Sequence, residues 1–201
     1  MRIDEIFCSI QGEGTRRGRP CAFVRLTGCP LRCRWCDTEY AFHGGTEMDL
    51  DEVRARVAEF GPRLVCVTGG EPLAQPAVHD LMRILLEDGF EVVLETSGAI
   101  DARAVDDRVI RILDLKAPGS GEVDRNHWPN FQVLRSTDEI KVVIADREDF
   151  DWARQQLEAL DLVARTHAVL FSPVHGELEP ADLAAWVLEE SLPVVLQLQE
   201  H

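Results

Sequence analysis

The sequence predicts an α/β protein in which helices cover a mainly parallel sheet. Two observations lead to this fold class: short apolar, β-branched segments alternate with segments of helical periodicity, and only short connections join them. The chain has 201 residues, of which 45% are apolar, so it can bury one sizeable core. Because no linker or change of composition divides it, we expect a single domain over residues 1–201.

The first half of the chain predicts strands and helices in alternation. The apolar segment 21–27 is expected to form a buried strand, and a helix over 50–60 is expected to follow Asp49, a residue type common at helix N-caps. A β-branched strand follows over 64–68, and apolar residues at helical spacing predict a helix over 77–88. Glycines follow both of these segments and end them.

The second half predicts mostly strands. Short apolar runs bounded by turn residues are expected as strands over 91–95, 111–115, 140–144, 167–171 and 194–198. Helical periodicity predicts a helix over 147–160, and Pro180 can open a helix that ends near residue 190. Residues 117–138 are rich in Gly, Pro, Ser and Asn and predict a loop that could include a short helix. Ligands of parallel sheets collect at the carboxyl ends of the strands, so we expect the polar strand-end residues to share one rim.

The composition argues against two classes of function. Lys and Arg total 21 and Asp and Glu total 36, and the resulting net charge of −15 repels a phosphate backbone, so we expect no nucleic-acid partner. No apolar run approaches the roughly 18 residues of a membrane helix. The charged N-terminus is not followed by the apolar segment of a signal peptide. We therefore expect a cytoplasmic protein with no membrane partner.

The basic residues are distributed unevenly. The chain has two lysines, Lys116 and Lys141, and 19 arginines, which together make the 21 basic residues. Each lysine follows an acidic residue and an apolar residue. A coding preference for arginine would explain the ratio. Alternatively, the chain keeps lysine where a compact, rotatable ammonium group is needed.

Six cysteines in a chain without a secretory signal do not predict disulfides, and three of them, Cys29, Cys33 and Cys36, lie within eight residues. Soft thiolates select zinc, Cu(I) or iron–sulfur clusters. Three ligands suit a four-iron cluster with one open iron, whereas structural zinc needs a fourth ligand. The cysteines left to complete a zinc site are Cys8, Cys21 and Cys66.

The Cys-x3-Cys-x2-Cys spacing, with Trp35 before the last cysteine, resembles that of the radical S-adenosylmethionine (SAM) enzymes. Residues 69–72, Gly-Gly-Glu-Pro, resemble the motif by which these enzymes bind the methionine amino group of SAM. The resemblance implies a [4Fe–4S] cluster on the three cysteines, with SAM on the fourth iron. Reductive cleavage of SAM then yields a 5′-deoxyadenosyl radical.

Residues 7–14, Phe-Cys-Ser-Ile-Gln-Gly-Glu-Gly, and the tripeptide at 36–38, Cys-Asp-Thr, resemble the 7-carboxy-7-deazaguanine synthase family. Similarities at residues 95–98 and 172–174 and in the last six residues extend this likeness over essentially the whole chain. It implies a shortened radical-SAM β/α barrel with fewer outer helices, and a homodimer. The implied reaction is that of a carbon–nitrogen lyase supported by Mg²⁺. It contracts the ring of 6-carboxy-5,6,7,8-tetrahydropterin to 7-carboxy-7-deazaguanine with loss of ammonia, for queuosine-type 7-deazapurines.

The resemblance also assigns roles to single residues. The metal ligands are expected at Cys29, Cys33, Cys36 and Thr38. Contacts to SAM are expected at Asp37, Gly70, Glu71, Ser97 and Lys116. Contacts to the substrate are expected at Ile10, Gln11, Gly12, Glu13, Arg25, Thr68, Gly69 and His201.

Structural roles stay open for some of these residues. Arg25 lies in an apolar strand and needs a partner, which is either a substrate carboxylate or a structural ion pair. The Thr38 hydroxyl can join a Mg²⁺ shell or bond its own backbone in a turn. Gln11 and Glu13 match the donors and acceptors of a pterin, but the glycines beside them also suit a plain polar turn.

Two alternative functions share part of this pattern. An activase that installs a glycyl radical on a partner protein would need the cysteines and the glycine motif, but not the combination of residues 11–14 with the Cys-Asp-Thr tripeptide. A zinc-stabilised interaction module would need only the cysteines. For the synthase, the expected electron donor is a flavodoxin or a ferredoxin.

Overall fold

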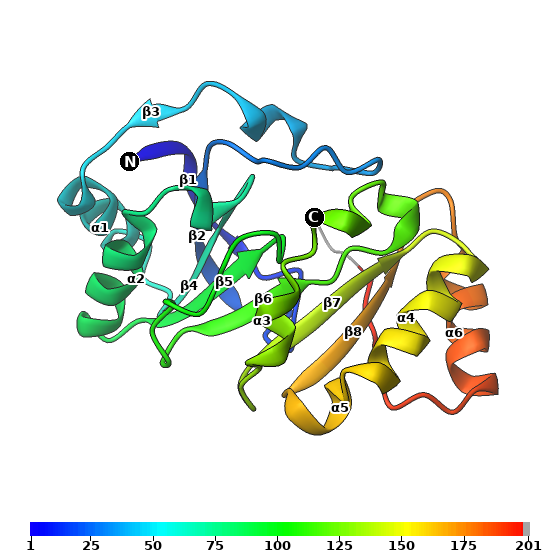
Figure 1. Cartoon of the computed structure of the whole chain (residues 1–201). Coiled ribbons are helices and arrows are strands. Elements are labelled where there is room, and N and C mark those ends of the chain that lie inside the picture. The colour runs from blue at the N-terminus through cyan, green and yellow to red at the C-terminus, as the bar shows by residue number, and fades with distance from the viewer. Residues whose placement is uncertain (199–201) are drawn as a thin grey trace.

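The computed structural model describes residues 1–198, and within them nine strands form one sheet in the order β3-β1-β2-β4-β5-β6-β7-β8-β9 (Figure 1). The strands are β1 (Arg2–Ile10), β2 (Pro20–Leu26), β3 (Thr46–Glu47), β4 (Leu64–Gly69), β5 (Glu91–Thr96), β6 (Ile110–Asp114), β7 (Glu139–Ile144), β8 (Ala168–Pro173) and β9 (Val195–Leu196). All neighbours from β2 to β9 pair in parallel, and only β1 pairs antiparallel, with β2 and β3. The mainly parallel α/β fold is confirmed, and strand pairing does not close the sheet into a full barrel.

The helices cover one face of the sheet (Figure 1). They are α1 (Leu50–Ala58), α2 (Val78–Glu87), α3 (Trp128–Gln132), α4 (Arg147–Ala159), α5 (Leu162–Arg165) and α6 (Pro180–Glu189). Four short 3-10 helices are η1 (Glu39–Phe42), η2 (Pro72–Ala74), η3 (Pro118–Ser120) and η4 (Val123–Arg125). Asp49 caps α1 in a reciprocal pair with Glu52, as the sequence indicates. No helix in residues 1–198 is both long and apolar enough to cross a membrane.

Strict alternation of strands and helices is wrong at two connections, that between β1 and β2 and that between β5 and β6. Residues 97–109, between β5 and β6, form turns and contain no helix. The segment between β6 and β7 forms only η3, η4 and the short α3, which agrees with the loop expected there. Between β5 and β6, Asp101 and Asp106 accept from the backbone N of Arg103 and Arg108, both at 2.9 Å, and these side-chain turns take the place of a helix.

Alternate residues of the central strands contact two different environments. Val65 and Val67 of β4 are fully buried beneath the helices, whereas Cys66 packs on the opposite face with Cys21 and Phe23 of β2. The inner face of the sheet is therefore apolar at this cluster. Toward the carboxyl ends of the strands, polar residues such as Thr68, Glu95 and Ser97 line a cavity on the same face.

β1 is a strand that the sequence pattern does not predict, because most of its residues are only partly buried or exposed and it lacks a continuous apolar run. β1 and β2 form a hairpin whose loop, residues 11–19, reaches across the open side of the sheet. Gly14 N donates to Gln197 Oε1 at 3.2 Å, and Thr15 Oγ1 donates to Glu139 Oε1 at 2.6 Å. The loop thereby connects the two ends of the sheet that strand pairing leaves apart.

An ion pair whose two side chains are both fully buried joins Arg111 and Asp138. The guanidinium of Arg111 on β6 is fully buried and donates through Nε to Asp138 Oδ1 at 2.8 Å and through Nη1 to Ala102 O at 3.0 Å. Asp138 is also fully buried. The pair joins the start of β6 to the turn before β7.

We expect Asp138→Asn to lower the free energy of unfolding by about 3–5 kcal/mol, because it leaves a buried guanidinium without its counter-charge. Chemical denaturation measures this loss. The matched control is Asp101→Asn, which breaks an exposed pair with Arg103 and should change stability little. Equal losses in the two variants would contradict the structural importance of the buried pair.

Candidate functional site

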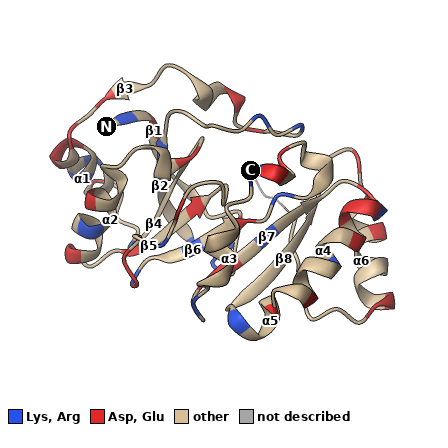
Figure 2. Ribbon diagram, viewed as in Figure 1, with Lys and Arg blue, Asp and Glu red and all other residues tan. Residues whose placement is uncertain are grey.

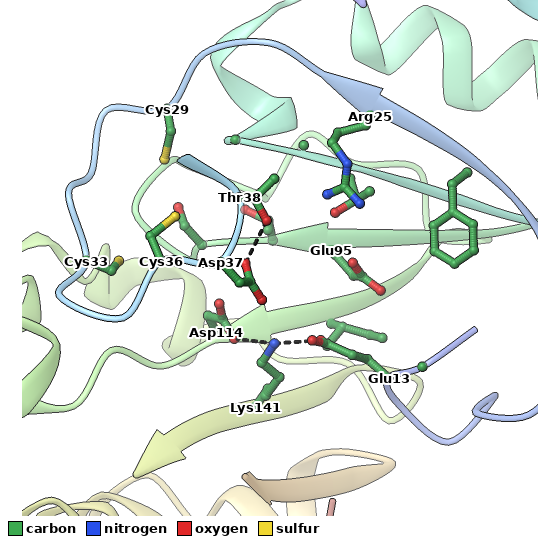
Figure 3. Close-up of a pocket in the computed structure, with 18 of the residues that line it drawn as sticks. Glu13, Arg25, Cys29, Cys33, Cys36, Asp37, Thr38, Glu95, Asp114 and Lys141 are labelled. Atoms are coloured by element: carbon green, nitrogen blue, oxygen red, sulfur yellow. Dashed lines mark hydrogen bonds and ion pairs between the residues drawn. The ribbon is translucent and has the colours of Figure 1, made fainter. Parts of the chain in front are cut away.

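A cavity of about 430 Å³ opens beside the carboxyl ends of β4, β5 and β6 (Figure 3). Its wall includes most of the residues singled out from the sequence: Ile10, Gln11, Gly12, Glu13, Arg25, Cys29, Cys33, Cys36, Asp37, Thr38, Thr68, Gly69, Gly70, Ser97 and Lys116. The aromatic side chains of Phe7, Phe23, Trp35, Tyr40 and Phe42 also line it. Residues at the ends of β4, β5 and β6 therefore share one rim, as predicted, whereas Ser172 and Pro173 at the end of β8 do not line the cavity.

Three cysteines on the loop after β2 form one end of the cavity. Cys29, Cys33 and Cys36 are free and half-buried (Figure 3). No three His, Cys, Asp or Glu side chains in the described part of the chain converge closely enough to hold a single metal ion. A four-iron cluster makes no such demand, because each cysteine binds a different iron. Burial raises the pKa of each of the three thiols, so metal binding would release protons.

Arginines of the cysteine loop attach it to the segment after β6. Arg34 donates from its backbone N to Ser120 O and from Nε to Gly119 O, both at 3.0 Å. The backbone N of Arg32 donates to Glu122 Oε1 at 2.5 Å. The loop is therefore fixed by the η3–η4 region, which the sequence indicated only as a glycine- and proline-rich loop.

The glycine pair after β4 packs against the backbone that begins the cysteine loop. Gly70 N donates to Leu26 O at 3.0 Å, and Glu71 N donates to Gly28 O at 2.8 Å. A Cβ atom on Gly70 would lie 2.3 Å from Gly28 O and 2.9 Å from Cys29 Cβ. Only glycine allows this approach, so the glycine pair positions the cysteine loop as well as lining the cavity.

Glu71 does not face the cavity. Its carboxylate is fully buried and accepts from Leu73 N at 2.9 Å, Thr96 Oγ1 at 2.9 Å and Ser97 N at 2.7 Å, and also from the Ser97 hydroxyl. In this arrangement the carboxylate holds the turn after β5 against η2. The sequence motif identifies the segment, and the expected contact between this side chain and the SAM ammonium stays a prediction.

Oxygen donors lie next to the cysteines. Thr38 Oγ1 donates to Asp37 Oδ1 at 2.6 Å, and both side chains line the cavity (Figure 3). Hydroxyl and carboxylate oxygens are the donor type that Mg²⁺ prefers. The Thr38 side chain thus bonds to its neighbour's carboxylate rather than to its own backbone.

The hairpin loop supplies the opposite end of the cavity. Gln11 is buried and donates through Nε2 to Glu95 Oε1 at 3.2 Å, while its Oε1 accepts from Glu13 N at 3.1 Å. The nitrogen and the oxygen of the Gln11 amide are therefore both hydrogen-bonded, and these bonds fix the conformation of the loop. Thr68 is buried in the cavity wall nearby, and His201 lies outside the described residues.

Arg25 forms a structural ion pair, which is one of the two alternatives that the sequence allowed. Its Nε donates to Glu5 Oε1 at 2.8 Å, and the guanidinium lies 5.8 Å from the ring centroids of Phe7 and Tyr40. The guanidinium also lines the cavity and points into it (Figure 3). The ion pair with Glu5 and a contact to a ligand in the cavity are thus compatible.

Three charged residues without an assigned role, Glu95, Asp114 and Lys141, also line the cavity. Burial and the neighbouring Glu13 raise the pKa of Glu95, while Lys141 opposes the shift. Burial alone would raise the pKa of Asp114, but Lys116 and Lys141 bring it below its usual value. The sequence signal for Glu95 and Asp114 is a carboxylate near the end of an otherwise apolar strand, which is costly unless it is paired.

The family model of the Radical SAM superfamily matches residues 23–160, more than half of the chain. The chain therefore belongs to this superfamily, whose members use a [4Fe–4S] cluster and SAM. A crystal structure of QueE from Escherichia coli has the same fold, with a TM-score of 0.75 and 23% identity, covering 100% of this chain and 94% of that chain. Streptococcus suis SuiB bound to S-adenosylmethionine aligns with a TM-score of 0.60 and 10% identity, covering 87% of this chain and 45% of that chain.

Two curated relatives show which family within this superfamily the chain belongs to. The 7-carboxy-7-deazaguanine synthase of Chlorobaculum tepidum is 44% identical, with 100% of this chain and 92% of the relative covered. The synthase of Koribacter versatilis is 43% identical, with 100% of this chain and 95% of the relative covered. The chain belongs to the 7-carboxy-7-deazaguanine synthase family.

We expect Gly70→Ala to reduce the iron bound per chain after anaerobic reconstitution, because the added methyl group displaces Gly28 and Cys29. Overpacking of this kind also lowers the free energy of unfolding by about 1–3 kcal/mol. Gly18→Ala is the control, since it strains a positive φ of 86° but meets no atom within 4 Å. Wild-type iron content in Gly70→Ala would show that the cysteine loop does not depend on this packing.

Proposed function

We propose that this chain converts 6-carboxy-5,6,7,8-tetrahydropterin to 7-carboxy-7-deazaguanine with loss of ammonia, as a carbon–nitrogen lyase of queuosine-type 7-deazapurine biosynthesis. The observation that carries the proposal is the single cavity that joins the cysteine loop to Gln11 and Glu13 of the hairpin loop. The names of the full-length relatives support the same activity.

The donor set fits the cofactors of the superfamily. Three free, half-buried thiols suit a cluster with one open iron, so we assign Cys29, Cys33 and Cys36 as its ligands. Gly69, Gly70, Ser97, Lys116 and Asp37 line the same end of the cavity and are our candidates for contacting SAM. When bound and reduced, the two cofactors supply a 5′-deoxyadenosyl radical for hydrogen abstraction from the substrate.

The chain's own residues bind and orient the substrate. The amide of Gln11 and the carboxylate of Glu13 complement the donors and acceptors of a pterin, and Arg25 offers charge-assisted hydrogen bonds to its carboxylate. The stacked rings of Phe7 and Phe23, with centroids 4.9 Å apart, form part of a flat apolar wall that suits a planar heterocycle and excludes water.

Further parts of the proposal concern proton transfer, metal and partners. Glu95 lines the cavity and is our candidate for exchanging a proton with the departing ammonia. Thr38, beside Asp37, is our candidate ligand for Mg²⁺ near the substrate carboxylate. A homodimer, a cytoplasmic location and an electron donor such as flavodoxin or ferredoxin remain predictions from the family resemblance.

Anaerobic incubation of the reconstituted protein with dithionite, SAM, Mg²⁺ and 6-carboxytetrahydropterin should give 7-carboxy-7-deazaguanine, detected by mass spectrometry. SAM should not be consumed stoichiometrically, because hydrogen returns to regenerate it. Formation of 5′-deoxyadenosine without this product would contradict the proposed substrate. A radical transferred to a glycine of a large partner protein would instead favour the activase.

Replacing Cys29, Cys33 or Cys36 singly by alanine should remove most of the iron and acid-labile sulfide, and with them SAM cleavage, because each thiolate binds one iron. Metal and sulfide analysis of the purified variants measures the effect. Cys8→Ala is the matched control, since Cys8 is exposed and does not line the cavity. Zinc without sulfide in the wild-type protein would contradict the cluster and favour the zinc module.

A further inference from the structure

The chain's two lysines lie in the same cavity, on either side of one carboxylate. Lys116 Nζ is 2.6 Å from Asp114 Oδ2, and Lys141 Nζ is 3.7 Å from Asp114 Oδ1. All three residues line the cavity, and the exposed fractions of their side chains are 14%, 9% and 20% for Lys116, Lys141 and Asp114. The chain thus uses lysine instead of arginine only at these two positions, where both ammonium groups contact Asp114 inside the cavity.

Lys141 also contacts the hairpin loop. Its Nζ is 2.5 Å from Glu13 Oε2, although the two residues are 128 positions apart in the sequence (Figure 3). Lys141 is on β7, a central strand with parallel neighbours on both sides, whereas Glu13 is on a loop. The sheet therefore provides a fixed cation for a loop carboxylate that points into the cavity.

The charges around Glu13 show why this cation matters. Glu95 lies on the same side of the cavity. It is a second carboxylate, so its negative charge repels that of Glu13. Gln11 bridges the backbone of Glu13 to the carboxylate of Glu95. Without the ammonium of Lys141, this arrangement would leave a largely buried carboxylate beside a like-charged group and without this strong partner.

We propose that Lys141 is a positioning residue, which holds the Glu13 carboxylate in place for the substrate, with Asp114 and Lys116 completing the charge balance. The inference rests on the proposed function, in which Glu13 contacts the pterin. An ammonium group suits this task because its three donors rotate to serve Glu13 and Asp114 together. The planar guanidinium of an arginine presents its donors in a fixed fork and does not replace it fully.

Equilibrium binding of 6-carboxypterin, a fluorescent oxidised analogue of the substrate, tests the proposal on the reconstituted holoenzyme. We expect Glu13→Ala and Lys141→Met each to raise Kd about 10-fold, a typical loss for a charge-assisted contact. Because Lys141 acts through Glu13, the double variant should bind no more weakly than the weaker single variant. Lys141→Arg should recover part of the loss. Arg83→Met, which removes an exposed cation of α2, should bind like the wild type.

Product formation by the same variants adds a kinetic test. Lys141→Met should raise KM for the tetrahydropterin by a factor similar to the rise in Kd, whereas a merely structural defect would lower the fraction of active enzyme and leave KM unchanged. Circular dichroism and iron content establish that each variant is folded and loaded. A double variant whose loss equals the product of the single losses would overturn the proposal, as would an unchanged Kd in Lys141→Met.

A crystal structure of Lys141→Met separates this inference from the proposed function. If the wild type neither binds the pterin analogue nor forms product from the tetrahydropterin, the proposed substrate is wrong, and the position of Glu13 in the variant still decides the role of Lys141. A carboxylate of Glu13 that turns away from its wild-type position would support positioning by Lys141. The same carboxylate in its wild-type position would overturn it.

Discussion

The arrangement of the cavity depends on the hydrogen bonds between the hairpin loop and the far side of the sheet. Strand pairing leaves the sheet open, since β3 and β9 are its two edges. Glu139 at the start of β7 accepts from Thr15, and Gln197 after β9 accepts from Gly14 and donates to Gly12 O at 3.3 Å. Both glutamine and glutamate are buried, so these bonds form away from water and are costly to leave unmade. They place the loop that carries Gln11 and Glu13 across the open side of the sheet.

The charge of the cavity differs from that of the whole chain. The net charge is −15, and acidic residues are spread over the helices (Figure 2). The residues that line the cavity include three cations, Lys116, Lys141 and Arg25, and four carboxylates, those of Glu13, Asp37, Glu95 and Asp114. Glu5 also pairs with Arg25. The cavity thus gathers cations that can contact an anionic group of a ligand, although the protein as a whole is strongly acidic.

Backbone packing, rather than charge, connects the glycine motif to the cysteine loop. Gly70 contacts the backbone of Gly28 too closely for any side chain, and Glu71 uses its carboxylate to hold the turn that begins at Thr96. The motif was recognised from its residue types, and its segment lies where the resemblance implies. The role of Glu71 could not be inferred from the motif alone, because three of its four donors belong to Thr96 and Ser97, some 25 residues away.

The fold class, most strands and helices, and the position of the site at the strand ends could be predicted from the sequence alone, because these depend on local periodicity and on short motifs. The strand β1 could not be predicted in this way, since its pattern is mixed because this strand is only partly buried. Only the tertiary structure decided which charged groups meet, such as Arg25 with Glu5 and Lys141 with Glu13. Side-chain type shows that a buried charge needs a partner, but the partner is selected by strand order and by the path of the hairpin loop, which bring together residues as far as 128 positions apart.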